Sequence, residues 1–402
     1  MKINIKKLIL VILIILVVLP NNFSIGSISI YKITCIFSIM VTLYIILNKD
    51  LKKVYITNLF FIMNVILSVF ILFTFIFMEN IQFNDYFEIL RFLVMGLITI
   101  NVMAICKKKE YYIFFLKGLC IATTLMAILG IVQYFNPFNI NEKYIYIYAP
   151  TQYHSLVGNY KYPRIVSTKP NPTQYGFIAI IAVYIQLMYF KYYKHKWVGI
   201  ASIALILTSL MMTLSRTTQI AFVVSIIVYC FMKVKSSKGI IKALIALMVE
   251  ITIIFAILQI LPEELTWRLE QSTDLDSVSS WNDRIGKWEE YIEIIDQNLL
   301  FGIGPVKNLV SELGYVDSEF FQILIQYGLI GFLIYIITVL SPLCYYKKNR
   351  NITIYYLPIV IAILICNIAA TTFLSSETSI IIYVMLGILF ASKECSEKIE
   401  KE

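Results

Sequence analysis

Charged side chains are scarce in this sequence. Asp, Glu, Lys and Arg account for only 15% of the 402 residues, whereas hydrophobic residues account for 59%. A soluble domain carries about a quarter charged residues, which excludes a soluble domain for most of this length. The apolar/polar alternation of a membrane β-barrel is also lacking. The apolar residues occur instead in runs of about twenty, the length that crosses a hydrocarbon core, so the sequence predicts an all-α, polytopic integral membrane helix bundle.

The number of such runs predicts about 12 transmembrane helices. We place them at roughly 7–20, 28–47, 55–78, 87–105, 111–134, 173–191, 197–214, 217–233, 239–262, 319–345, 352–372 and 377–392. The first run lacks the small-residue cleavage site of a signal peptide, because Pro20-Asn21-Asn22 follows it. We therefore interpret it as an uncleaved span. Residues 1–402 are expected to form a single transmembrane domain, since no repeat or separate soluble segment interrupts them.

Lysine is concentrated in every second connection between these runs. The clusters hold 22 of the 34 cations and begin at Lys2, Lys49, Lys107, Lys191, Lys233, Lys347 and Lys393. Cytoplasmic connections of membrane proteins carry such an excess of cations. The pattern predicts that both termini are cytoplasmic. It also accounts for the net charge of +9 without nucleic-acid binding.

Two of the outer connections are long, at 135–172 and 263–318. The second contains Ile285, Trp288, Ile292, Ile295 and Leu299 at steps of three and four residues, the spacing of an amphipathic helix. We expect this helix to lie in the outer membrane interface.

Metal-type clusters of cysteine are lacking. The seven cysteines fall in predicted spans or on the cytoplasmic side, and their spacing matches no metal site. The sequence therefore predicts neither a disulfide framework, nor a metal site, nor a cofactor.

Arginine is rare, and its distribution differs from that of lysine. Of six arginines, five map to the outer half of the membrane or to outer loops: Arg91, Arg164, Arg216, Arg268 and Arg284. A guanidinium binds phosphate through two parallel hydrogen bonds, which an ammonium cannot do. This distribution indicates an outward-facing site for a lipid-linked phosphate or pyrophosphate. Arginines that reach lipid headgroups or pair with acids are the alternative.

Two further motifs lie at the outer ends of spans. KPNPTQYG, residues 169–176, precedes the sixth span, where Asn171 and Thr173 either cap the helix or bind a ligand. Asp317-Ser318-Glu319 precedes the tenth span. Its two carboxylates either supply a general base or stabilise a helix N-terminus.

Residues 160–340 resemble the O-antigen ligase/polymerase superfamily of bacterial polysaccharide assembly. Four elements occur in that family's order: RIVSTKPNPTQYG from Arg164, the Ser215-Arg216 turn, RIGKWEEYIEIIDQNLLFGIG from Arg284, and DSEFFQILIQYGLIGFL from Asp317. The resemblance implies transfer of a glycan from undecaprenyl pyrophosphate to an acceptor hydroxyl, at the outer face of the bacterial cytoplasmic membrane.

The resemblance also implies roles for individual residues. Arg216 and Arg284 would hold the pyrophosphate and stabilise the leaving group, and Asp317 or Glu319 would be the base. Substrate binding would be completed by Arg91, Arg164, Asn171, Trp288 and Arg268. No metal is needed if arginines carry this charge.

Ligases of this family typically have His-Asn where this chain has Asp317-Ser318, a departure that favours a polymerase of capsular, exo- or O-antigen-type polysaccharide. A flippase and a chain-length regulator are the expected partner proteins. An O-antigen-type ligase, a flippase for lipid-linked oligosaccharide, a transferase that uses polyprenyl-monophosphate sugars, and a structural membrane protein remain alternatives. The monophosphate-dependent enzymes typically carry acidic residues in the first outer loop, and residues 20–27 contain none.

Overall fold

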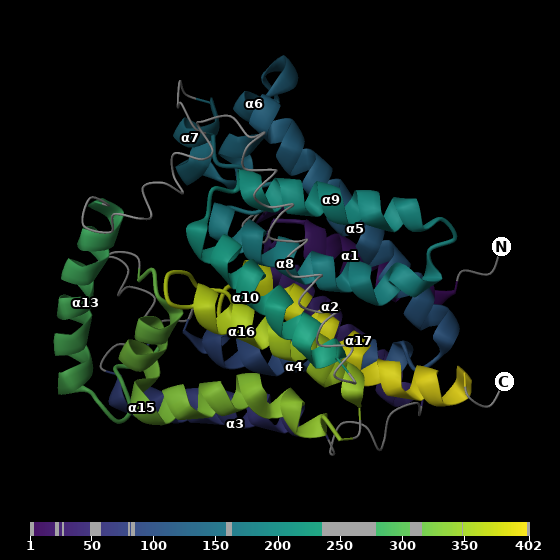
Figure 1. Cartoon of the computed structure of the whole chain (residues 1–402). Coiled ribbons are helices and arrows are strands. Elements are labelled where there is room, and N and C mark those ends of the chain that lie inside the picture. The colour runs from purple at the N-terminus through teal and green to yellow at the C-terminus, as the bar shows by residue number, and fades with distance from the viewer. Residues whose placement is uncertain are drawn as a thin grey trace. The chain divides into compact units, whose positions relative to one another are not determined.

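The computed structural model describes residues 4–20, 24–25, 28–48, 58–78, 81, 85–157, 163–234, 279–305, 316–347 and 349–399. The first part comprises α1 (Ile5–Val18), β1 (Ser24–Ile25), β2 (Ile28–Ser29), α2 (Ile30–Leu47), α3 (Leu59–Thr74), η1 (Phe75–Phe77), α4 (Tyr86–Ile105) and α5 (Lys109–Phe135). Next come η2 (Pro137–Asn139), α6 (Ile140–Tyr148), η3 (Pro150–Gln152), α7 (Tyr153–Val157), α8 (Pro172–Tyr189), η4 (Phe190–Tyr192), α9 (Lys196–Met212) and α10 (Arg216–Lys233). The last are α13 (Ser279–Gln297), α15 (Glu319–Leu340), η7 (Ser341–Tyr345), the π-helix η8 (Ile352–Tyr356), α16 (Leu357–Cys366) and α17 (Ser376–Ile399) (Figure 1).

The predicted all-α, polytopic membrane fold is confirmed. Every predicted span coincides with a helix, except 239–262, which lies outside the described residues. Within the described ranges, six helices are long and apolar enough to cross a membrane, and further apolar helices are shorter. The two-residue strands β1 and β2 pair in antiparallel fashion in the short connection between α1 and α2.

The chain divides into two compact units. Unit 1 comprises residues 1–122, 288–352 and 367–402, and unit 2 comprises 123–287 and 353–366. In unit 1, α4 packs against α2, α3 and α17, and α3 packs against α15. Tyr383 joins three of these helices, because its carbonyl accepts from Thr99 Oγ1 (2.9 Å) and its hydroxyl donates to Asn64 Oδ1 (2.7 Å). The single-domain description stays a prediction.

In unit 2, α8 packs against α9, α10 and α16. Its side chains are buried along almost the whole helix, and Tyr184 donates from α8 to Ser225 of α10 (2.8 Å). The connection between α5 and α8 contains α6 and α7, whose buried residues Ile145, Ala149 and Leu156 form a small core with Val166. This core fixes the chain just before α8.

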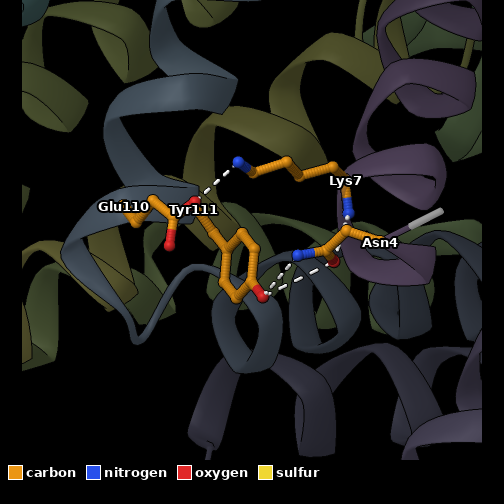
Figure 2. Close-up of polar contacts among 4 residues, drawn as sticks. All are labelled: Asn4, Lys7, Glu110 and Tyr111. Atoms are coloured by element: carbon orange, nitrogen blue, oxygen red, sulfur yellow. Dashed lines mark hydrogen bonds and ion pairs between the residues drawn. The ribbon is translucent and has the colours of Figure 1, made fainter. Parts of the chain in front are cut away.

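Contacts between helix ends agree with the predicted alternation across the membrane. Figure 2 shows the start of α1 beside the start of α5, where Lys7 pairs with Glu110 (2.6 Å) and Asn4 Nδ2 donates to the Tyr111 hydroxyl (3.0 Å). Both helix starts carry lysine clusters, and the predicted order of spans puts both on the same side of the membrane. Tyr345 at the end of η7 likewise accepts from the backbone N–H of Leu59 at the start of α3 (2.7 Å). Which side is cytoplasmic stays a prediction.

The helix α15 is broken at Gly328, which has φ +60° and ψ −167°. Glu319 nonetheless bonds to Tyr335 (2.5 Å), and the rings of Phe320 and Phe332 lie 5.9 Å apart. In a straight helix, residues sixteen positions apart would be separated by about 24 Å. Residues 319–327 therefore fold back on the rest of α15, which Figure 1 draws in two pieces. The predicted span 319–345 coincides with this apolar helix, but its reversal at Gly328 was not predicted, because hydropathy does not register a backbone reversal.

The break is closed by backbone hydrogen bonds to the segment that follows α13. Backbone groups in the hydrocarbon region need internal partners, and four bonds between the two segments supply them: Ile303 N to Ile325 O, Gly304 N to Gln326 O, Leu329 N to Leu299 O, and Ile330 N to Leu300 O. An added Cβ on Gly328 would lie 2.4 Å from the Leu300 carbonyl. Glycine is therefore required at this position.

Replacing Gly328 by Ala should destabilise the protein. The backbone region it occupies is nearly exclusive to glycine and costs other residues about 1–3 kcal/mol, and the clash with Leu300 adds to this. The control is Gly286→Ala in α13, where an added Cβ meets nothing within 4 Å. We expect a lower thermal unfolding temperature in detergent for the first variant and an unchanged or higher one for the control. Equal unfolding temperatures in both variants would contradict the fold-back.

Candidate functional site

In unit 2, two of the predicted site arginines, Arg164 and Arg216, lie at the turn between α9 and α10. Leu214 adopts a left-handed conformation (φ +50°), which turns the chain directly from α9 into α10. Arg164 Nε donates to the carbonyl of Thr213 in this turn (3.3 Å). Arg216 is the first residue of α10. The structure therefore places both arginines at one turn, and both are half-buried.

The KPNPTQYG motif reaches the same turn. Asn171 caps α8 by accepting from Thr173 N (2.8 Å), which is one of the two roles expected of it, and Thr173 Oγ1 lies 3.1 Å from Ser215 Oγ. Gly176 allows the close approach of α8 to α10, because an added Cβ would lie 2.6 Å from Thr218 Oγ1. The predicted residues Arg164, Asn171 and Arg216 are thus brought together by short-range contacts.

Gln133 holds the segment that carries Arg164. Its Oε1 accepts from the backbone N–H groups of Val166 (3.2 Å) and Ser167 (2.7 Å), and its Nε2 donates to the Ser167 carbonyl and to the Tyr148 hydroxyl, each at 2.6 Å. Ser167 has a positive φ of +52°, a conformation that these bonds stabilise. Gln133 was not predicted from the sequence as a residue of this site. Its only signal is a lone amide near the end of an otherwise apolar run.

In unit 1, the carboxylate of Glu319 is fully buried and accepts five hydrogen bonds. The donors to Oε1 are the Tyr335 hydroxyl (2.5 Å) and Asn367 Nδ2 (3.1 Å). Oε2 accepts from three consecutive backbone N–H groups, those of Thr372 (2.6 Å), Phe373 (2.9 Å) and Leu374 (3.1 Å). This network ties the start of α15 to the connection between α16 and α17. Glu319 was predicted from the sequence as a site residue, but its partners were not, because they lie 16 to 55 residues away.

Asp317 differs from Glu319 in its surroundings. It is partly exposed, whereas its neighbours Val316 and Ser318 are buried. Val316 packs with Tyr291 of α13. Burial, followed by the negative charges of Asp317 and Glu290, raises the pKa of Tyr291, which places the Asp317 carboxylate near that ring.

The helix α13 confirms the predicted helix, and its location in the outer membrane interface stays a prediction. Tyr291 and Ile295 are buried, with Trp288 packed beside them against Phe321 (5.4 Å between ring centroids). Ile285, Ile292 and Leu299 remain more than two fifths exposed. The face of α13 that packs against protein is therefore centred on Tyr291, and only part of the predicted apolar stripe belongs to it. Arg284 lies in α13, but its side chain, like all of Arg268, lies outside the described part.

Arg91 lies in the second turn of α4 and pairs with Glu88 (2.8 Å). Its charge is also close to the hydroxyls of Tyr31 in α2 and Tyr327 beside the α15 break. This is the pairing with an acid that the sequence analysis kept as an alternative. In the described residues, Arg91, Trp288, Asp317 and Glu319 belong to unit 1, whereas Arg164, Asn171 and Arg216 belong to unit 2.

Residues 201–336 match a family model described as O-antigen ligase. The predicted resemblance to the O-antigen ligase/polymerase superfamily is confirmed. The match covers about a third of the chain and includes the Ser215-Arg216 turn, Arg284 and Asp317-Ser318-Glu319. It supports O-antigen ligase/polymerase-type function in general. No curated protein matches the chain.

Several residues of the sites described above lie outside the matched segment 201–336, among them Arg164, Gln133 and Asn367. Arg164 nevertheless contacts Thr213, and Asn367 contacts Glu319. Both therefore touch residues inside the matched segment. Each site therefore combines residues from inside and outside the matched segment.

Replacing Asn171 separates its capping role from ligand binding. Asn171→Ala removes the acceptor for Thr173 N–H, and we expect it to cost about 1 kcal/mol of stability. Asn171→Ser retains a capping oxygen but lacks the amide, so we expect an unfolding temperature close to that of the wild type. Equal destabilisation by Ala and Ser would refute the cap. Loss of activity in the stable Ser variant would assign the amide a role in binding.

Proposed function

We propose that the protein polymerises undecaprenyl-pyrophosphate-linked repeat units into capsular, exo- or O-antigen-type polysaccharide. The observation that carries this proposal is the O-antigen ligase match over residues 201–336. It is supported by the turn at which Arg164, Asn171 and Arg216 gather. The reaction belongs to the outer face of the bacterial cytoplasmic membrane.

The arginines are proposed to bind the pyrophosphate of the donor. Charge accumulates on the pyrophosphate as the bond from the sugar to its oxygen breaks, and pre-positioned cations stabilise that charge. The bond from Arg164 Nε to Thr213 O fixes one guanidinium beside the residue that begins α10, Arg216. Arg284 is proposed to share the leaving-group role with Arg216. Arg268, Arg91 and Trp288 are proposed to complete the binding of donor or acceptor.

The chemical step is proposed to be a direct glycosyl transfer. The acceptor hydroxyl attacks the anomeric carbon, the carbon–oxygen bond to the pyrophosphate breaks, and undecaprenyl pyrophosphate leaves with the bonding electrons. A carboxylate, Asp317 or Glu319, takes the proton of the hydroxyl as general base. Each atom and charge is accounted for by the two substrates and one side chain, and the arginines provide the positive charge for which other transferases use a metal.

The membrane orientation is part of the proposal. With both termini in the cytoplasm, the starts of α4, α8, α10 and α15 all lie at the outer side, and these starts carry Arg91, Asn171, Arg216 and Glu319. A flippase that delivers the donor and a chain-length regulator are proposed partners, and the lysine clusters are proposed to report orientation rather than nucleic-acid binding.

A lipid-linked oligosaccharide flippase is the second candidate, and one observation favours it. Transporters often contain broken helices whose N-terminal ends bind an anionic substrate, and α15 is broken at Gly328. In this chain, however, the N–H groups of Leu329 and Ile330, which begin the second piece of α15, already donate to the carbonyls of Leu299 and Leu300. An anionic substrate would have to displace these carbonyls, which favours a transferase. An O-antigen-type ligase uses the same donor and differs only in its acceptor.

Purified protein should polymerise lipid-linked repeat units in detergent or vesicles without other proteins. Arg216→Ala and Arg284→Ala should lower the rate by about 100-fold or more, the range for removal of one charge-stabilising donor. Arg216→Lys should recover little, because an ammonium lacks the two-pronged geometry. The measurement is the length distribution of the labelled glycan.

The matched control is Arg350→Ala, which removes the arginine that precedes η8 on the predicted cytoplasmic side and should leave polymer length unchanged. Normal polymer from both outer variants would refute the pyrophosphate site. Movement of the lipid-linked repeat unit across vesicles without chain growth would favour the flippase. A deletion strain should accumulate single repeat units on the lipid carrier, and persistence of long polymer in it would refute the proposal.

A further inference from the structure

The Glu319 carboxylate has no open hydrogen-bond position for a substrate hydroxyl. A carboxylate offers about four lone-pair positions, and five donors already occupy the two oxygens. The side chain is fully buried, as are Tyr335, Asn367 and Thr372 around it. A sugar hydroxyl could reach it only after the network had opened.

We propose that Glu319 is a positioning residue and that Asp317 is the general base of the transfer. This inference rests on the proposed glycosyl transfer. It assigns the role of base to one carboxylate and a positioning role to the other. The network of Glu319, Tyr335 and Asn367 then holds the Asp317 carboxylate in place.

The network fixes Asp317 from its C-terminal side through Asn367. The carbonyl of Asn367 accepts from Ser318 Oγ (3.1 Å) and from Glu319 N (3.0 Å). Its side-chain Nδ2 donates to both Glu319 Oε1 and the Tyr335 hydroxyl (2.8 Å), and its Oδ1 accepts from Thr372 Oγ1 (2.5 Å). One residue thus holds the backbone immediately after Asp317 and the carboxylate two positions further on.

The N-terminal side of Asp317 is fixed by packing. Val316 is buried with Tyr291, Ile295 and Ile325, so the chain is held on both sides of a residue whose own side chain is partly exposed. Tyr291 of α13 is the titratable side chain on which the Asp317 charge acts. This is the arrangement expected of a base that must meet a substrate from outside while keeping a fixed position.

The two carboxylates should behave differently when their charge is removed. In Glu319→Gln, the amide NH₂ replaces one oxygen and faces either the three backbone N–H groups or the donors at Oε1, so the segment shifts. A displacement of about 1 Å at a reacting group can cost about 100-fold in rate. In Asp317→Asn, the base itself is lost while the position of the backbone is kept.

The test compares Asp317→Asn, Glu319→Gln and Tyr335→Phe in the purified full-length chain, with kcat and KM measured across pH. A carboxylate base makes the rate fall at low pH, when it becomes protonated. We expect Asp317→Asn to lose most of kcat together with this fall. Glu319→Gln should lose about 100-fold in kcat, and Tyr335→Phe a smaller factor, while both keep the fall at low pH and the wild-type KM.

The opposite pattern would overturn the inference: loss of the low-pH fall in Glu319→Gln and its retention in Asp317→Asn. Wild-type kcat in Tyr335→Phe would also count against it, and this variant retains the charge should Glu319→Gln fail to fold. An inactive wild-type protein overturns the proposed function itself, a result distinct from either.

A measurement that needs no activity completes the test. A carbodiimide with an amine nucleophile should modify Asp317 and leave Glu319 unmodified in the folded wild-type protein, as read by mass spectrometry of the peptide that contains both. Modification of Glu319 before Asp317 would overturn the inference.

Discussion

The five hydrogen bonds to the Glu319 carboxylate are the interaction on which the architecture of unit 1 depends. An isolated carboxylate is too costly to bury in hydrocarbon surroundings, so the charge is stable only if these donors converge on it. Their convergence requires residues 319–327 to fold back along α15, which in turn requires the glycine conformation at 328. The connection between α16 and α17 is held by the same bonds, and so is the backbone beside Asp317.

Lysine and arginine carry different information in this chain. Lysine clusters mark alternate connections, and contacts such as Lys7–Glu110 join helix ends that count to the same side. Arg164 and Arg216 lie instead at the turn between α9 and α10, and Arg91 pairs with Glu88 within α4. Lysine thus bears on the predicted orientation, and the arginines bear on the proposed binding of the pyrophosphate.

Hydropathy predicted the helices well because each span needs a long run of apolar side chains, whether these face lipid or neighbouring helices. Local rules also predicted the Asn171 cap, since its partner Thr173 is two residues away. Long-range features were not predictable in this way. The fold-back of α15 lies inside an apolar run whose composition is unchanged by a reversal, and Gly328 is its only local sign. Gln133 and Asn367 act on backbone groups that only the folded chain brings near them. The stripe on α13 was predicted from aliphatic spacing, which left out Tyr291.

The central claim is that Glu319 holds α15 folded back, and proximity of Phe320 to Phe332 tests it most directly. Cysteines would replace both residues in a chain whose seven native cysteines are changed to serine. A bifunctional thiol reagent too short to span about 18 Å, the separation in a straight helix, would then be applied. The account predicts a cross-link in this chain, none for the control pair Ile220 and Met232 in α10, and a reduced yield after Glu319→Gln. Absence of the cross-link between positions 320 and 332, or an equal yield with and without the Glu319 charge, would contradict it.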